Sequence, residues 1–230
     1  MRVLSISLLV LLCVSLATPA RCEVNQNARH ILERVEARLL AAKNIEFFVY
    51  VDIKEPYARS LNGPLKLEGD RMEGDFRGSI GPDQARLLVT ADGKELKLSL
   101  NADQRSGTQP AALRESMLVS LIRIGFANTL INLSQLKPPE HSEGGVKDWI
   151  TVENVQVREA PVSQGYHSGE IALQFAITIN GKPGGHTRLW ISTQTGLPLR
   201  REQFFDYETA DGKMAVMRAD ERYTTFIADP

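Results

Sequence analysis

Side chains able to bind a metal are few in this chain and are not spaced to cooperate. Its histidines are His30, His141, His167 and His186. No two of them stand two or four residues apart, the spacing that would place two ligands on one face of a strand or a helix. We therefore predict surface histidines and no metal site.

The sequence also lacks the residue patterns that are typical of catalytic sites. No serine lies in a Gly-x-Ser-x-Gly turn, and the glycine-rich stretch 181–185 lacks the Ser or Thr and the following helix of a phosphate-binding loop. The acidic residues fall mostly on the polar faces of candidate strands, where solvated charges belong. We interpret the Arg200-Arg201 pair as a solvated strand end. No catalytic residue and no cofactor is predicted, so an enzyme such as a hydrolase is the least favoured function.

The N-terminus has the pattern of an export signal. Arg2 precedes an apolar run, Val3 to Ala17, and small residues follow it. We expect cleavage after Ala20 or after Cys22, with residues 23–230 forming a single periplasmic or secreted domain. Because Cys13 lies inside the signal, the mature chain cannot form an intrachain disulfide. A lipid on Cys22 is disfavoured, since Arg21 stands where a lipoprotein signal needs a small residue.

The charge balance disfavours nucleic acid as a partner. The full chain has 27 basic and 28 acidic residues, and cleavage after Cys22 would remove Arg2 and Arg21 but no acid, leaving 25 against 28 and a net charge of −3. Nucleic-acid binding normally needs a concentrated basic face. We expect a protein that works without nucleic acid, as a monomer.

Most of the chain alternates between apolar and polar residues, as half-buried strands do. The exception at the start is an amphipathic helix predicted over Asn27–Lys43. About ten strands follow, and Asp92-Gly93, Asn180-Gly181 and Asp211-Gly212 are typical hairpin turns. The predicted strands lie at 45–54, 61–68, 71–80, 96–100, 149–158, 171–179, 187–192, 198–205, 214–217 and 223–227. A single antiparallel sheet of this size curls strongly because strand twist accumulates.

One long apolar helix, predicted over Ala111–Leu136, interrupts the strands. It is apolar around most of its circumference, whereas a surface helix shows one apolar stripe. Polar residues such as Arg123 and Asn128 disfavour a membrane span. Polar segments at Gln104–Pro110 and Pro138–Gly145 are expected to be loops on either side of it. The helix therefore either fills the concave face of the sheet or closes over an apolar ligand bound there.

The order of these elements resembles the LolA/LolB-like superfamily of periplasmic outer-membrane lipoprotein carriers and receptors. Gly63–Leu67 followed by Arg71–Arg77 looks like a strand pair of that family, and Leu87–Leu96 is similar to its hairpin before a lid helix. Leu189–Glu202 resembles a strand–turn–strand unit of exported relatives. The resemblance implies an α+β fold, an incomplete barrel of one curved antiparallel sheet closed by helices, with an apolar cavity for acyl chains.

The sequence departs from that family at one position. Its carrier proteins have an Arg-Pro pair after the first of these strands, and the arginine holds the lid. Here Gly69-Asp70 occupies that place and Arg71 comes shortly after.

We predict an exported, non-catalytic carrier that binds a lipid or the acyl chain of an acylated protein between the sheet and the central helix. A closed core without a cavity fits the same sequence. So does an envelope sensor or adaptor that binds a protein partner with this fold. The residues expected to contact the ligand are Met117, Leu118, Leu121, Ile122, Phe126 and Leu130 from the helix, and Phe47, Val49, Phe76, Leu98, Leu173 and Phe175 from the sheet.

Overall fold

The computed structural model describes residues 19–54, 58–134, 145–158, 169–208 and 212–229, with the side chains of 19–26, 130–134 and 206–208 left out. The helices are α1 (Pro19–Ala41), α2 (Leu113–Arg123), α3 (Gly125–Ser134) and α4 (Val146–Trp149). The strands before α2 are β1 (Asn44–Lys54), β2 (Arg59–Glu68), β3 (Arg71–Ile80), β4 (Asp83–Asp92), β5 (Glu95–Leu100) and β6 (Asp103–Thr108). The strands after α4 are β7 (Ile150–Arg158), β8 (Glu170–Ile179), β9 (Lys182–Ser192), β10 (Pro198–Glu208) and β11 (Met214–Asp229).

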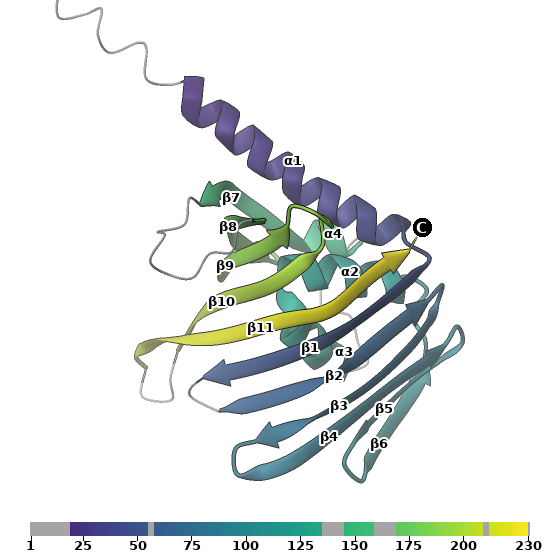
Figure 1. The fold of residues 1–230 in the computed structure, drawn as a ribbon. Helices are drawn as coiled ribbons and strands as arrows, with labels where there is room; N and C mark the ends of the chain where they lie inside the picture. Colours follow the sequence, from purple (N-terminus) through teal and green to yellow (C-terminus); the bar gives the residue numbers. More distant parts are fainter. Residues whose placement is uncertain (1–18, 55–57, 135–144, 159–168, 209–211, 230) are drawn as a thin grey trace, which may run out of the picture.

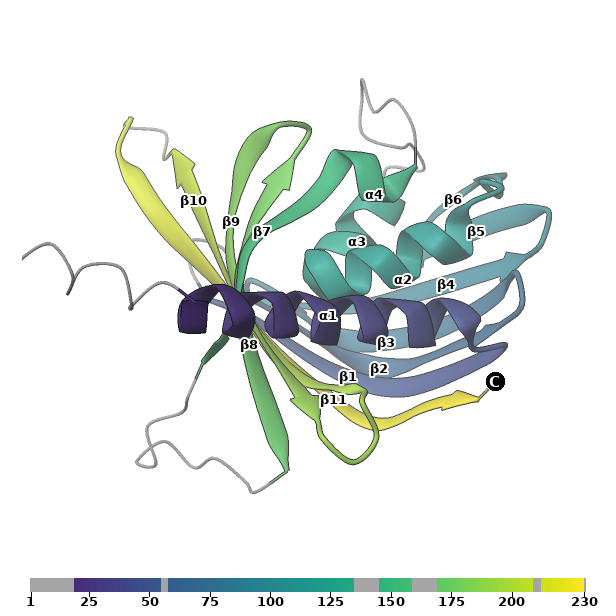
Figure 2. The ribbon, with the colours of Figure 1, turned by 90° about the horizontal axis from the view of Figure 1, so that it is seen from above.

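These strands form one eleven-stranded antiparallel sheet in the order β6-β5-β4-β3-β2-β1-β11-β10-β9-β8-β7. Two meanders, β1–β6 and β7–β11, meet where β1 pairs with β11. The sheet is bowed and does not close on itself (Figure 1). Figure 2 shows α2 and α3 within the curve and α1 lying across the top of the sheet. The predicted architecture, a single curved antiparallel sheet with helices, is confirmed at this level.

Alternation along the strands decides which residues form the core. On β1 the residues Ile45, Phe47, Val49, Val51 and Ile53 are all buried, while the residues between them are exposed or half-buried. Helix α1 contributes a second buried stripe, spaced at helical intervals: Ala28, Leu32, Val35, Leu39 and Ala42, which follows its end. The core therefore lies between the concave face of the sheet and the helices.

The predicted turn at Asn180-Gly181 has the expected backbone. Asn180 and Gly181 form the two-residue turn between β8 and β9, where Ile179 pairs with Lys182, and their φ angles are 49° and 73°. Positive φ at both central residues is the requirement of the turn that matches strand twist. Gly93, with φ of 96°, lies in the turn between β4 and β5.

The predicted single helix over Ala111–Leu136 is wrong, because the structure has two. Helix α2 ends at Arg123 and α3 begins at Gly125, whose φ of 81° is incompatible with a continuous right-handed helix. Asn128 and Thr129, in the first turns of α3, bond back to the carbonyls of Ile124 and Gly125.

The strand predictions also need correction at three places. The predicted loop Gln104–Pro110 largely forms β6. The inner positions of this strand are charged residues and a glycine, so it lacks the alternation of apolar and polar residues that predicts a strand. Asp83–Asp92 forms a full strand, β4. The separate strands predicted at 214–217 and 223–227 are one long strand, β11.

The N-terminal prediction lies largely outside the described residues, which begin at Pro19. Helix α1 starts eight residues before the predicted Asn27 and runs through both candidate cleavage points. Signal cleavage stays a prediction. Among the residues that the structure describes, no helix combines the length and the hydropathy needed to cross a membrane.

Candidate ligand cavity beneath helix α3

Helix α2 is packed tightly into the core. Met117, Leu118, Leu121 and Ile122 are all buried in the same hydrophobic cluster as the inner face of the sheet. These four side chains therefore belong to the core between α2 and the sheet.

Charged side chains fix both ends of α2. Near its start, Arg114 donates to the carbonyl of Gly69, at 2.8 Å, and to that of Ala42. At its end, Arg123 donates to both carboxylate oxygens of Glu36 in α1, at 2.7 and 3.0 Å. This ion pair is nearly buried, and a two-pronged Arg–carboxylate pair sets orientation as well as attraction. Helix α2 is therefore fixed to α1 and to the turn between β2 and β3.

Arg201 on β10 caps the C-terminus of α2. Its side chain is 1 % exposed and donates to the carbonyl of Ile122 at 2.6 Å, and also to the carbonyls of Leu121 and Arg123. Thr187 and Gln203 accept its remaining hydrogen bonds, at 2.9 and 3.0 Å. The last carbonyls of a helix have no partner within the helix and carry partial negative charge, so a buried guanidinium is well placed there.

Glu221 on β11 caps the N-terminus of α3 in the complementary way. Its two carboxylate oxygens each accept a backbone N–H, from Phe126 and Ala127, both at 3.0 Å. The Tyr223 hydroxyl also donates to it. A carboxylate satisfies the unpaired N–H groups of a helix start and interacts favourably with its dipole. The interpretation of Arg200-Arg201 as a solvated strand end is thus wrong for Arg201, and Glu221 does not lie on a polar strand face.

Burial shifts the ionisation of two members of this cluster. Desolvation lowers the pKa of Arg201, although the nearby Glu221 opposes the change. Desolvation, reinforced by Glu221, raises the pKa of the Tyr223 hydroxyl well above its usual range. The tyrosine therefore keeps its proton and remains a donor to the carboxylate.

Gly125 lets the two helix ends approach these side chains. A Cβ atom at this position would lie 2.7 Å from a Glu221 carboxylate oxygen and 2.8 Å from Nε of Arg201. No side chain fits there without displacing one of the two charged groups. The break between the helices and the buried ion cluster consequently depend on each other.

The ring of Phe126 packs α3 against the concave face of the sheet. Its ring lies 5.7 Å from that of Phe47 on β1 and 5.1 Å from that of Phe76 on β3. Both contacts have the edge-on or tilted geometry that aromatic pairs favour.

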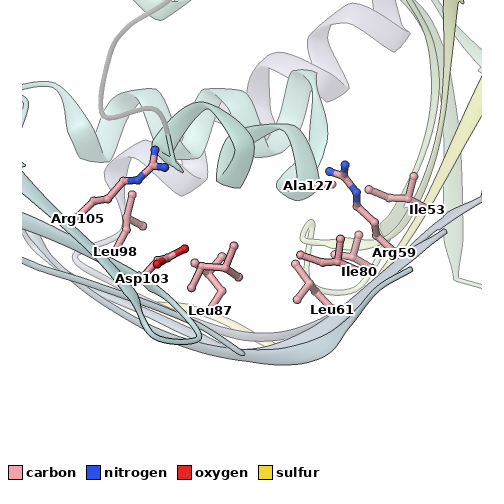
Figure 3. A pocket seen from close by; sticks show the side chains of 11 residues that line it. Ile53, Arg59, Leu61, Ile80, Leu87, Leu98, Asp103, Arg105 and Ala127 are labelled. Carbon is pink, nitrogen blue, oxygen red and sulfur yellow. The ribbon is translucent and has the colours of Figure 1, made fainter. Parts of the chain in front are cut away.

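A cavity opens beyond this aromatic contact, between α3 and strands β1 to β6 (Figure 3). Its volume is about 250 Å³, close to the lower end of the range for ligand sites, which is about 300–1,000 Å³. Its wall is mostly aliphatic and includes Ala127 from α3. The remaining lining residues are Val51, Ile53, Arg59, Leu61, Ile80, Leu87, Leu98, Leu100, Asp103 and Arg105.

The twelve residues predicted to contact a ligand do not all meet at this cavity. Leu98 lines it, whereas Phe47, Val49, Phe76, Leu173 and Phe175 are buried in the packed core beside the α2 residues and Phe126. The side chain of Leu130 lies outside the described residues. Whether the described residues of this set contact a ligand stays a prediction.

The sequence predicts a cavity beneath one helix, Ala111–Leu136. The structure has two helices there, α2 and α3, and the cavity lies beneath α3. The signal that separates them is Gly125, the only glycine in the apolar run, which ends one helix and starts another. The described residues contain no group of three or more His, Cys, Asp or Glu side chains able to hold a metal ion.

Comparisons with known proteins give only distant likenesses. No protein-family model and no curated protein matches the chain. It is similar to a crystal structure of MucB, with 16% identity over 89% of this chain and 60% of that one and a TM-score of 0.39. It is also similar to a DUF1329 family protein from Desulfovibrio piger, with 12% identity over 90% and 93% of the two chains and a TM-score of 0.35. A LolA superfamily protein from Nitrosomonas europaea has 9% identity over 88% and 94%, with a TM-score of 0.34. The argument for function therefore comes from the cavity itself.

Proposed function

We propose that this protein is an exported, non-catalytic carrier that binds an acyl chain in the cavity between α3 and the sheet. The observation that carries the proposal is the aliphatic wall formed by residues of several strands and by Ala127. Each methylene moved from water to such a surface contributes about 0.8 kcal/mol, so a chain of ordinary length needs few polar contacts.

The volume favours one chain over several. A cavity of about 250 Å³ is small beside most ligand sites, so a single extended hydrocarbon chain suits it better than a multiply acylated anchor. The bound part of the ligand would be either a free lipid or one chain of an acylated protein.

The test is lipid uptake by the purified mature protein. We expect native mass spectrometry to detect a bound lipid, and a neutral fluorescent apolar probe to bind and be displaced by fatty acids. The variant Ala127→Phe puts a large ring into the cavity and should abolish probe binding. The variant Ala37→Phe makes the same change on an exposed face of α1 and should leave it unchanged. Absence of any bound lipid or probe in the unmodified protein would refute the proposal.

A second candidate function, binding of an envelope protein, is favoured by a different surface. Met214 and Val216, near the start of β11, are 69% and 56% exposed. Methionine is enriched at protein interfaces. Replacement of both by serine should then prevent capture of a stoichiometric protein partner while lipid uptake stays unchanged.

A further inference from the structure

The cavity wall contains charged as well as apolar residues. Three of its described lining residues are charged, Arg59, Asp103 and Arg105, giving this wall a net charge of +1. Figure 3 shows Arg59 and Arg105 rising from opposite sides of the floor, with Leu61 and Leu87 between them.

Arg59 occupies an inner position of the sheet, where its neighbours are apolar. On the two adjacent strands it pairs directly with Ile53 of β1 and with Ile80 of β3, and both isoleucines line the cavity. Paired residues of antiparallel strands share a face, so the arginine stem lies along aliphatic surface. Arg59 is half-buried and its Nε is buried, so the guanidinium lies partly within the cavity wall.

Arg105 and Asp103 are placed by the same rule. They pair with Leu98 and Leu100 of β5, so they face the cavity from β6. Inward charges on an edge strand also protect a sheet from pairing with other chains, and that would account for these two residues. Edge protection does not account for Arg59, because β2 lies between β1 and β3 in the interior of the sheet.

We propose that the cavity selects single-chain amphiphiles with an anionic headgroup, which Arg59 binds from the cavity wall. This inference rests on the proposed carrier function. Arg105 adds attraction that the neighbouring Asp103 partly cancels. A carboxylate or a phosphate monoester has suitable chemistry, since a guanidinium donates two parallel hydrogen bonds to either.

The experiment compares amphiphiles with one chain length and different charge. Laurate, monolaurin and lauryl-trimethylammonium are anionic, neutral and cationic, and each is titrated against the bound neutral fluorescent probe. A hydrogen bond to a charged group contributes about 1.5–3 kcal/mol, so we expect laurate to displace the probe at concentrations at least about tenfold lower than monolaurin. The cationic compound should be the weakest.

Variants assign the preference to individual residues. Arg59→Gln should reduce the difference between laurate and monolaurin at least fivefold (about 1 kcal/mol), and Arg59→Lys should restore part of it. Asp103→Asn should strengthen laurate binding about twofold. Arg77→Gln removes the same charge from the outer face of β3 and is the matched control.

The outcomes separate the two proposals. Equal displacement by laurate and monolaurin, or preference for the cationic compound, would overturn the headgroup inference while the carrier function stands. The same holds if Arg59→Gln, folded as judged by an unchanged melting temperature, keeps the full preference for laurate. Failure of every amphiphile and of the probe to bind would overturn the carrier function, and the inference with it.

Discussion

Arg201 and Glu221 lie directly opposite each other on β10 and β11 and bind the facing ends of two helices. Arg201 donates hydrogen bonds to the last carbonyls of α2, and Glu221 accepts hydrogen bonds from the first N–H groups of α3. Each charge thus meets the helix terminus of opposite partial charge, and the pair holds the bend between the helices over the sheet.

We expect Arg201→Met to be strongly destabilising. The substitution leaves the Glu221 carboxylate buried without its cation and removes the donor from the carbonyls that end α2. Removing one partner of a buried pair costs about 3–5 kcal/mol. Urea unfolding measures the change in the free energy of unfolding. Arg222→Met, on the exposed face of β11, should stay within about 0.5 kcal/mol of the unmodified protein.

The double variant Arg201→Met/Glu221→Gln gives a further check. Because the uncompensated carboxylate is gone, its destabilisation should be smaller than the two single effects combined. Additive effects would show that the two side chains act independently.

Gly125→Ala should lower stability by about 2 kcal/mol or more, because strain at positive φ adds to a collision with Glu221 and Arg201. Gly181→Ala is the matched control: its φ of 73° is similar, but nothing lies within 4 Å of the added carbon. Strain alone predicts a loss of about 1 kcal/mol there. Equal melting temperatures for the two variants would contradict the proposed fit at Gly125.

The raised pKa of Tyr223 predicts that the protein loses stability at high pH. In the unfolded chain its hydroxyl titrates near the usual value of 10.0, whereas burial in the native state raises its pKa well above that. Below the unfolded value both states hold the proton and the contribution is fully present. As the pH rises toward the native pKa, only the unfolded state releases the proton, so stability falls.

Tyr223→Phe should remove this part of the alkaline loss, as measured by urea unfolding over a pH series. Its stability near neutral pH should fall, because Glu221 loses a donor. The half-exposed Tyr50 provides the control, and Tyr50→Phe should keep the alkaline slope of the unmodified protein. An unchanged slope in Tyr223→Phe would assign the loss to other groups.

Affinity should rise with the chain length of a bound fatty acid until the cavity is full. Each added methylene should tighten binding about fourfold, following about 0.8 kcal/mol per buried group. Isothermal titration or probe displacement with a homologous series of fatty acids gives the slope and the length at which it ends. A flat series would argue against burial of the chain.

The architecture could be predicted from sequence where one face of an element is consistently apolar. The alternation from Ile45 to Ile53 and the tight turn at Asn180-Gly181 are local patterns, and both are confirmed. Strand β6 lacks such a pattern, since Asp103 and Arg105 face inward.

The ion cluster could not be predicted in the same way. Arg201 and Glu221 occupy inner positions that alternation assigns to apolar residues, and their partners are backbone groups about 80 and 94 residues away in sequence. Charge at such a position becomes favourable only when two helix ends reach it, which is a property of the assembled fold.

The pairing of β1 with β11 has a consequence for how the molecule is made. Asn44 pairs with Asp229, so the middle of the sheet joins strands from distant parts of the sequence. While the chain is still emerging from a ribosome or a translocation pore, the backbone of β1 lacks its hydrogen-bonded neighbour on one side. The missing neighbour is β11, which also carries Glu221. Until β11 pairs, β1 presents an unpaired strand edge that a chaperone would need to cover.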